Sequence, residues 1–137
     1  MPARILIAED EPDIRDFLTA VLKSGGYEVT EVADGAEVLT RLAEPAPDMV
    51  LMDLHMPLLS GLDALEQIRK VARWKDVPIL FLTASGMTDD MVRARALGAR
   101  GYLVKPIRSA DLLAKVKMVL EDKSLLWLDD ITRSRAI

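Results

Sequence analysis

The chain has 137 residues, a net charge of −4 at neutral pH, 50% hydrophobic residues and 29% charged residues, which fits one globular domain with a real core and argues against disorder. The modest negative charge gives no support for non-specific nucleic-acid binding. With no cysteine and one histidine, the sequence excludes disulfides, thiolate nucleophiles, sulfur-ligated metals and a multi-histidine zinc site within one chain.

The amino-terminal third predicts a strand, a helix and a second strand. Residues 4–8 form an aliphatic run, and Pro12 follows an acidic cluster at a place where the first turn of a helix tolerates proline. Residues 25–26, both glycine, end that helix, and residues 27–32 read as the second strand. Asp34 is expected to cap a short second helix. The first helix carries its apolar residues at helical spacing: Ile14, Phe17, Leu18, Val21 and Leu22.

The rest of the chain continues this alternation. Residues 48–53 and 77–83 are continuous apolar runs that predict two further strands, and residues 102–104 predict a short fifth strand. The expected caps of the last three helices are Ser60, Thr88 and Ser109. The expected inner face of the helix after Thr88 consists of Met91, Val92 and Leu97.

Five apolar strands that alternate with five helices indicate an α/β fold with three layers. The strands at 48–53 and 77–83 lack polar alternation, so both of their faces should be covered by helices. A parallel sheet joined by right-handed crossovers follows, although periodicity alone does not determine the strand order.

Residues 124–137 fall outside the alternation, and we expect residues 1–123 to form the folded domain. The run Leu125 to Leu128 is too apolar for a free tail. It could continue the last helix, act as a linker or dimerisation stalk, pack back on the domain, or dock on a partner. Because the sequence begins at methionine and ends without a tag, we favour packing on a complete single-domain protein.

Acidic, hydroxyl and basic residues fall at the carboxyl ends of four predicted strands. These are Glu9 and Asp10, Asp53, Thr83 and Lys105. In a parallel sheet these strand ends share one edge, where open α/β sheets bind ligands.

Three like charges in one crevice need compensation, since unit charges about 4 Å apart repel by roughly 4 kcal/mol at an effective dielectric near 20. An all-oxygen site of this kind suits Mg²⁺, with Mn²⁺ as the alternative.

Each of these residues also has an ordinary structural explanation when taken alone. Acids favour helix amino termini, Thr83 fits an ordinary strand, and Lys105 fits an ordinary loop. Together, a carboxylate nucleophile beside a metal, an ammonium group and a hydroxyl group make a phosphoryl-transfer environment. The joint pattern therefore indicates that Asp53 is a phosphoryl acceptor.

The chain resembles the receiver domain of two-component response regulators, of the stand-alone chemotaxis type. The resemblance covers about residues 3–122 and rests on an ordered set of motifs. The set comprises ILIAEDE with Glu9 and Asp10, DLHMPLLSG with Asp53, Pro57 and Gly61, LTAS with Thr83, and GYLVKP with Tyr102, Lys105 and Pro106.

The resemblance implies a flavodoxin-like five-stranded parallel sheet of order 2-1-3-4-5. It implies that Asp53 takes a phosphoryl group from a histidine kinase or a phosphotransfer protein. Asp10 and Asp53 would bind Mg²⁺ directly, Glu9 through water and His55 through its backbone carbonyl. Thr83 and Lys105 would hold the phosphoryl oxygens.

The resemblance also implies a switch. Thr83 would move toward the phosphoryl group and Tyr102 would turn inward, which changes a protein-binding face formed by the fourth helix, the fifth strand and the fifth helix. A downstream protein, or a second copy of the chain, would bind this face; the extension at 124–137 is an alternative dimer contact. The Lys105–Pro106 peptide bond is expected to be cis.

Some residues depart from the family pattern or tune it. Ile107 stands where an aromatic residue is common. His55 and Ser85 occupy positions that in the family influence the lifetime of the phosphoryl group.

The amino terminus is no signal peptide and no apolar run reaches membrane-spanning length, so we expect a cytoplasmic protein without a membrane or nucleic-acid partner.

Three other functions compete with the signalling switch. A haloacid-dehalogenase-type phosphatase shares the aspartate, metal, threonine and lysine, but it places an acid two residues after the nucleophile, where His55 stands here. A nucleotide-binding flavodoxin-like module would need a glycine-rich phosphate loop after the first strand. An interaction-only pseudo-receiver conflicts with the intact acceptor set.

Overall fold

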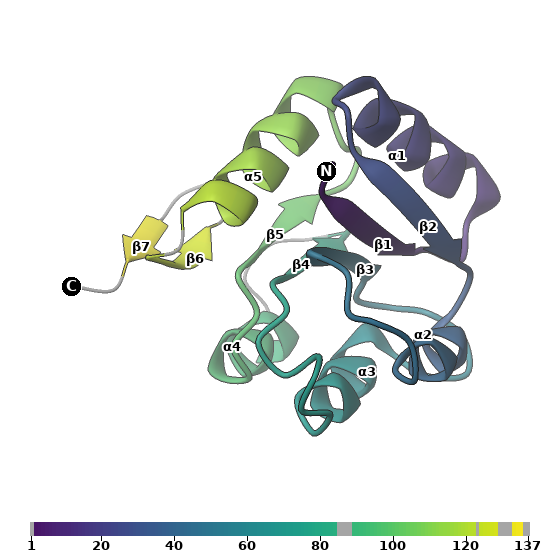
Figure 1. Ribbon diagram of the computed structural model, residues 1–137, viewed down its shortest axis with the longest axis vertical. Coiled ribbons are helices and arrows are strands. Elements are labelled where there is room, and N and C mark those ends of the chain that lie inside the picture. Colours follow the sequence, from purple (N-terminus) through teal and green to yellow (C-terminus); the bar gives the residue numbers. More distant parts are fainter. Residues whose placement is uncertain (1, 85–88, 123, 129–132, 136–137) are drawn as a thin grey trace.

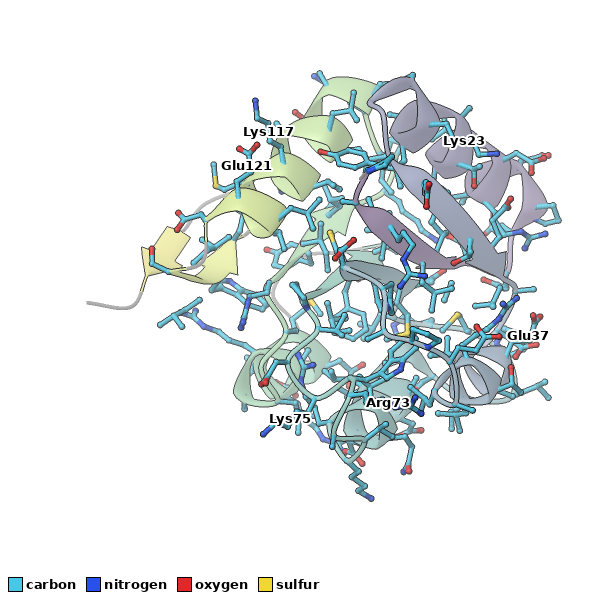
Figure 2. All side chains as sticks on the ribbon, viewed as in Figure 1. Lys23, Glu37, Arg73, Lys75, Lys117 and Glu121 are labelled. Carbon is cyan, nitrogen blue, oxygen red and sulfur yellow. The ribbon has the colours of Figure 1, made fainter. Side chains whose placement is uncertain are left out.

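The computed structural model describes residues 2–84, 89–122, 124–128 and 133–135. A central sheet separates two layers of helices, with α1 and α5 on one face and α2, α3 and α4 on the other (Figure 1). Charged side chains such as Lys23, Lys75 and Lys117 extend outward from these layers (Figure 2). In the described part of the chain, no helix has the length and apolar character needed to cross a membrane.

Short strands and helices alternate along the chain as the sequence predicts. The strands are β1 (Arg4–Ala8), β2 (Glu28–Val32), β3 (Met49–Asp53), β4 (Ile79–Thr83), β5 (Gly101–Val104), β6 (Leu125–Leu128) and β7 (Arg133–Arg135). The helices are α1 (Pro12–Ser24), α2 (Gly35–Arg41), α3 (Gly61–Ile68), α4 (Asp89–Ala96) and α5 (Ser109–Glu121).

The sheet has the order β2-β1-β3-β4-β5-β6-β7. All pairs from β2 to β6 are parallel, and β7 runs antiparallel to β6. The expected order of the first five strands is confirmed. The expected total of five strands is wrong, because apolar residues after α5 form β6 at the open edge of β5 and β7 pairs with β6.

The core consists of two apolar clusters, one on each face of the sheet. Every residue of β3 and β4 is buried, as their continuous apolar character predicts. Two residues expected on inner helix faces lie outward. Phe17 is 38% exposed on α1. On α4, Met91 is buried as expected, but Val92 is 57% exposed because adjacent residues of a helix point about 100° apart.

Two of the four expected helix caps, Asp34 and Ser60, are confirmed. Side chains of Asp34 and Ser60 accept hydrogen bonds from backbone N–H groups in the first turns of α2 and α3, at 2.8 Å and 3.1 Å. Ser109 is the first residue of α5 rather than its cap, a place held by Arg108. The expected cap Thr88 and the flanking residue Ser85 lie outside the described residues.

Candidate functional site

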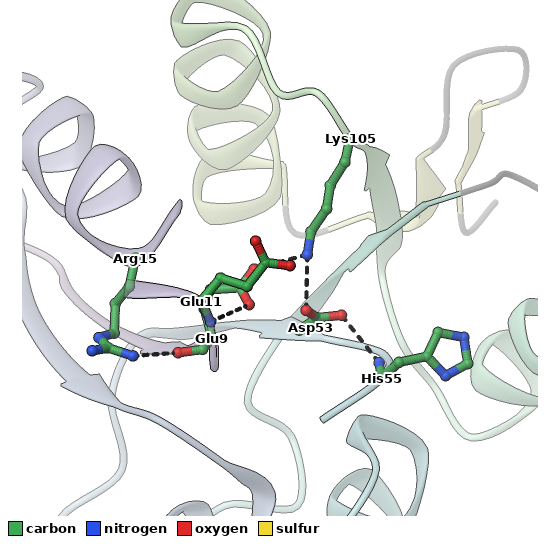
Figure 3. Close-up of polar contacts among 6 residues, drawn as sticks. All are labelled: Glu9, Glu11, Arg15, Asp53, His55 and Lys105. Carbon is green, nitrogen blue, oxygen red and sulfur yellow. Dashed lines mark hydrogen bonds and ion pairs between the residues drawn. The ribbon is translucent and has the colours of Figure 1, made fainter. Parts of the chain in front are cut away.

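Predicted site residues meet at the carboxyl edge of the sheet, and Figure 3 shows Glu9, Asp53, His55 and Lys105 among them. Glu9 and Asp10 follow β1, and Asp53 ends β3, the neighbouring strand. One carboxylate oxygen from each of these three residues lies within 4.8 Å of the others. The expectation that these acids converge is therefore confirmed by the geometry.

Lys105 joins two of these carboxylates. Its Nζ atom lies 2.8 Å from Oδ2 of Asp53 and 2.9 Å from Oε1 of Glu9 (Figure 3). Burial lowers the pKa of the ammonium group, but the adjacent carboxylates of Asp53 and Glu9 together raise it by more, so the pKa lies above its ordinary value. Lys105 therefore carries a fixed positive charge between two acids.

Glu9, the first residue after β1, is fully buried. Burial raises the pKa of its carboxyl group from 4.5 to about 7, with Lys105 opposing and Asp53 adding to the increase. The backbone N–H of Glu11 donates to Oε2 at 3.2 Å. Oε1 is buried and forms the 2.9 Å ion pair with Lys105, but in the described part of the chain it accepts no aligned hydrogen bond. Glu9 thus retains one buried oxygen suited to a further cation or water.

Asp53 is 5% exposed, and donors contact both of its oxygens. The backbone N–H of His55 donates to Oδ1 at 3.0 Å, while Lys105 donates to Oδ2. The imidazole of His55 is exposed and points away from Asp53 (Figure 3). Gly61, the first residue of α3, lies so close that a Cβ atom there would approach the Asp53 carbonyl oxygen to 2.3 Å. A side chain at this position would displace the acceptor loop.

Three carboxylates that converge on one point fit a hard divalent cation, which prefers oxygen ligands. The buried and unaligned Oε1 of Glu9 supports this fit, because a cation would satisfy it. The backbone carbonyl of His55 remains a predicted ligand.

Thr83 lies on β4, the strand next to the acceptor strand β3, and Tyr102 lies on β5, one strand further along the sheet. Thr83 ends β4 and is 2% exposed, and its carbonyl accepts the backbone N–H of Lys105 at 2.8 Å. Tyr102 lies on β5, is 2% exposed, and packs its ring against Trp127 of β6. The Lys105–Pro106 peptide bond is cis.

Sequence reasoning missed Arg15, which positions the acidic loop. Its Nη1 atom donates to the carbonyl oxygen of Glu9 at 2.7 Å (Figure 3). Its Nε atom lies 3.5 Å from Oε2 of Glu31 on β2. The signal available in the sequence was the positive charge of Arg15 near the amino terminus of α1. A basic residue close to a helix amino terminus opposes the helix dipole, so it needs a local reason to be there.

The fold and the carboxylate–lysine site together suggest a class of protein, and comparisons with known proteins identify that class. A sequence profile for the response regulator receiver domain matches residues 5–117. The chain therefore belongs to the response regulator receiver domain family, whose members are signalling switches.

Two solved structures illustrate the likeness. The chemotaxis response regulator CheY4 of Vibrio cholerae has 32% identity and a TM-score of 0.83 over 88% of this chain and 100% of that one. The receiver domain of a sensor histidine kinase from Pseudomonas aeruginosa has 33% identity and a TM-score of 0.80 over 88% of this chain and 98% of its own. That second structure has a magnesium ion coordinated in its active site cleft.

Curated relatives include longer proteins. The phosphate regulon transcriptional regulatory protein PhoB of Klebsiella pneumoniae is 33% identical over 100% of this chain and 60% of its own length. The DNA-binding response regulator MtrA of Mycolicibacterium smegmatis is 37% identical over 96% of this chain and 58% of its own length. The chain thus spans about 60% of these relatives.

Proposed function

We propose that Asp53 accepts a phosphoryl group from the phosphohistidine of a histidine kinase or phosphotransfer protein. The observation that carries this proposal is the buried cluster of Glu9, Asp10 and Asp53 bridged by Lys105. Glu9, Asp10 and Asp53, with the backbone carbonyl of His55, would hold Mg²⁺, which would neutralise charge on the transferring phosphoryl group. Mn²⁺ would serve as an alternative ion.

The residues divide the chemistry between them. A carboxylate oxygen of Asp53 forms a bond to phosphorus as the phosphorus–nitrogen bond of the donor breaks, and the electron pair of that bond stays on the donor imidazole. Lys105 supplies a fixed positive charge beside the acceptor oxygen. The Thr83 hydroxyl, at the end of the neighbouring strand, would bind a phosphoryl oxygen. Burial of Asp53 to 5% exposure limits competing water.

An apolar hollow beside the acceptor suits the phosphoryl donor. It is lined by Asp13, Ile14 and Phe17 of α1 and by Lys105, Pro106 and Ile107 after β5. Phe17 is 38% exposed there. A donor protein that packs on Phe17 and Ile107 would bring its phosphohistidine to the edge that carries Lys105 and Asp53.

The output of the proposed switch is protein binding rather than catalytic turnover. Thr83 and Tyr102 would transmit phosphorylation to the face of α4, β5 and α5, where a downstream protein or a second copy of the chain would bind. Residues 1–123 would form the receiver unit and residues 124–137 a carboxy-terminal extension. A haloacid-dehalogenase-type phosphatase gains no support, because the His55 side chain points away from Asp53 (Figure 3).

The direct test is intact mass after incubation with acetyl phosphate and Mg²⁺. We expect one added phosphoryl group on the unchanged chain and none on Asp53→Asn or after removal of Mg²⁺ with a chelator. Asp63→Asn is the matched control, because Asp63 is an exposed aspartate at the start of α3. This control should be phosphorylated like the unchanged chain.

Two results would contradict the proposal. An adduct that persists in Asp53→Asn would place the acceptor elsewhere. The absence of both an adduct and beryllofluoride binding in the unchanged chain would identify an interaction-only domain. Repeated turnover of p-nitrophenyl phosphate, measured in the same samples, would instead support the phosphatase alternative.

A further inference from the structure

Strand β6, which follows α5, covers the edge of β5. Strand β5 is part of the proposed output face. Strand β6 lies beside β5 and close to the end of α5 (Figure 1). The backbone N–H of Leu128 donates to the carbonyl of Arg100 at 2.7 Å, and Leu128 pairs in register with Gly101. The segment after α5 is therefore a docked part of the sheet.

The side chains of β6 enter both layers of the core. Leu125 and Leu128, which are 2% and 4% exposed, join the cluster under α1 and α5. Trp127 is fully buried and joins the cluster on the opposite face. A register irregularity between Leu125 and Trp127 allows this division, and it leaves Leu126 50% exposed. Apolar anchors on both faces hold β6 in place.

Trp127 packs on the residue proposed as the switch. Its ring lies 5.9 Å from the ring of Tyr102, centroid to centroid, with an interplanar angle of 57°. The guanidinium of Arg95 on α4 lies 5.2 Å from the Trp127 ring centroid, within range of a cation–π contact. Trp127 therefore contacts both β5 and α4, and it contacts Tyr102 while that side chain is only 2% exposed.

A short backbone route joins this contact to the acceptor site. Tyr102 pairs with Phe81 in the ladder between β5 and β4, and Val104 pairs with Thr83. The next residue, Lys105, hydrogen-bonds the Thr83 carbonyl through its backbone and Asp53 through its side chain. One strand thus carries the Trp127 contact in its middle and the phosphoryl-site lysine directly after its end.

We propose that β6 is a built-in effector of the switch, in which Trp127 favours the inward position of Tyr102 and thereby favours phosphorylation of Asp53. This inference rests on the proposed function. The ring contact is made with Tyr102 buried, and outward rotation of Tyr102 would break it, so docked β6 would bind the inward arrangement of the switch better. Linkage then requires that a phosphoryl group on Asp53 tightens the docking of β6 by the same factor.

The test compares binding of beryllofluoride with Mg²⁺, a non-hydrolysing mimic of the phosphoryl group, by calorimetric titration of the full chain. We expect Trp127→Ala to weaken beryllofluoride binding by about 5-fold or more, the lower end of common allosteric couplings. Leu126→Ala is the matched control, because Leu126 lies on the same strand with its side chain 50% exposed. This control should bind as tightly as the unchanged chain.

The reciprocal effect is measured on the unchanged chain by amide hydrogen exchange. Saturating beryllofluoride with Mg²⁺ should slow exchange of the Leu128 amide by a factor comparable to the affinity loss in Trp127→Ala. Equal beryllofluoride affinities and unchanged Leu128 exchange would overturn the coupling and leave Asp53 as acceptor. Failure of the unchanged chain to bind beryllofluoride would overturn the proposed function and this inference with it. If Trp127→Ala does not fold, the exchange measurement decides alone.

Discussion

At the scale of single residues, the site is a balance of buried charges. Glu9 and Asp53 are nearly inaccessible to solvent, and Lys105 lies within 2.9 Å of both. Burial destabilises the charged form of Glu9 by more than Lys105 stabilises it, so the pKa of Glu9 rises to about 7. The site therefore holds more negative charge than one lysine compensates, a state that favours binding of a divalent cation.

The first prediction is a pH dependence of stability that comes from Glu9. Its pKa is about 7 when folded and 4.5 in the ordinary state, so between these values the folded chain binds more protons than the unfolded chain. Without Mg²⁺, the free energy of unfolding should fall by up to about 3 kcal/mol as pH rises from 4.5 through 7, and the fall should level off about one pH unit above 7. Urea unfolding in chelator at a series of pH values measures this slope.

Glu9→Gln should remove this component of the slope, whereas Glu28→Gln, at an exposed position on β2, should retain it. Saturating Mg²⁺ should flatten the slope in the unchanged chain, because the cation binds the deprotonated carboxylate. Identical slopes in Glu9→Gln and the unchanged chain would show that Glu9 is not the titrating group.

At the scale of elements, the junction of β5 and β6 depends on a glycine. Gly101 has a φ of +152°, and a Cβ atom there would lie 1.8 Å from the carbonyl oxygen of Leu128. The missing side chain is what lets β6 approach the edge of β5. The same strand places Tyr102 against Trp127, so a disturbance at Gly101 reaches the switch contact directly.

The second prediction concerns Gly101→Ala, which should lower stability both by backbone strain and by displacing β6. Strain in a sparsely populated region costs about 1–3 kcal/mol, and the contact with Leu128 should add to it. Gly26→Ala is a matched control, because Gly26 also has a positive φ, +90°, but has open space around a Cβ atom. Urea unfolding measures the two losses, and Leu128 amide exchange reports whether β6 detaches.

We expect Gly101→Ala to lose more stability than Gly26→Ala and to accelerate Leu128 exchange, while Gly26→Ala leaves that exchange unchanged. Equal losses with protected Leu128 in both variants would mean that the β5–β6 contact adapts without cost.

At the scale of the whole molecule, the hydrophobic core includes residues of β6, which lies outside the five parallel strands predicted from the sequence. Leu125, Trp127 and Leu128 are all at most 4% exposed. Leu125 and Leu128 belong to the core cluster on one face of the sheet and Trp127 to the cluster on the other, so these side chains extend both clusters at this edge.

The third prediction is that deletion of residues 124–137 destabilises the chain. Burial of each large apolar side chain contributes about 1.5–3 kcal/mol, and the entropy of ordering the segment offsets part of this. A net loss of about 2–4 kcal/mol is expected, together with self-association through the uncovered edge. Urea unfolding and sedimentation velocity measure the two effects. The prediction fails if stability and oligomeric state both stay unchanged after the deletion.

The sequence by itself determined the alternation of strands and helices, the caps at Asp34 and Ser60, and the placing of Glu9, Asp10, Asp53 and Lys105 at strand ends. These features follow from local periodicity and local hydrogen bonding, which a linear pattern records. The convergence of the acids could also be inferred, because the carboxyl ends of parallel strands share one edge.

Only the tertiary structure decided which surfaces meet. Periodicity placed both Met91 and Val92 inward on α4, but packing buries Met91 and leaves Val92 exposed. The charge of Arg15 near a helix amino terminus was a local signal, but it did not identify the Glu9 carbonyl as the partner of Arg15. The apolar run after α5 was compatible with a helix, a stalk or a docked segment. Its place as β6 depends on the open edge of β5 and on Gly101, which lies more than twenty residues earlier in the chain. Contacts between residues so far apart in sequence leave no periodic signal in either segment.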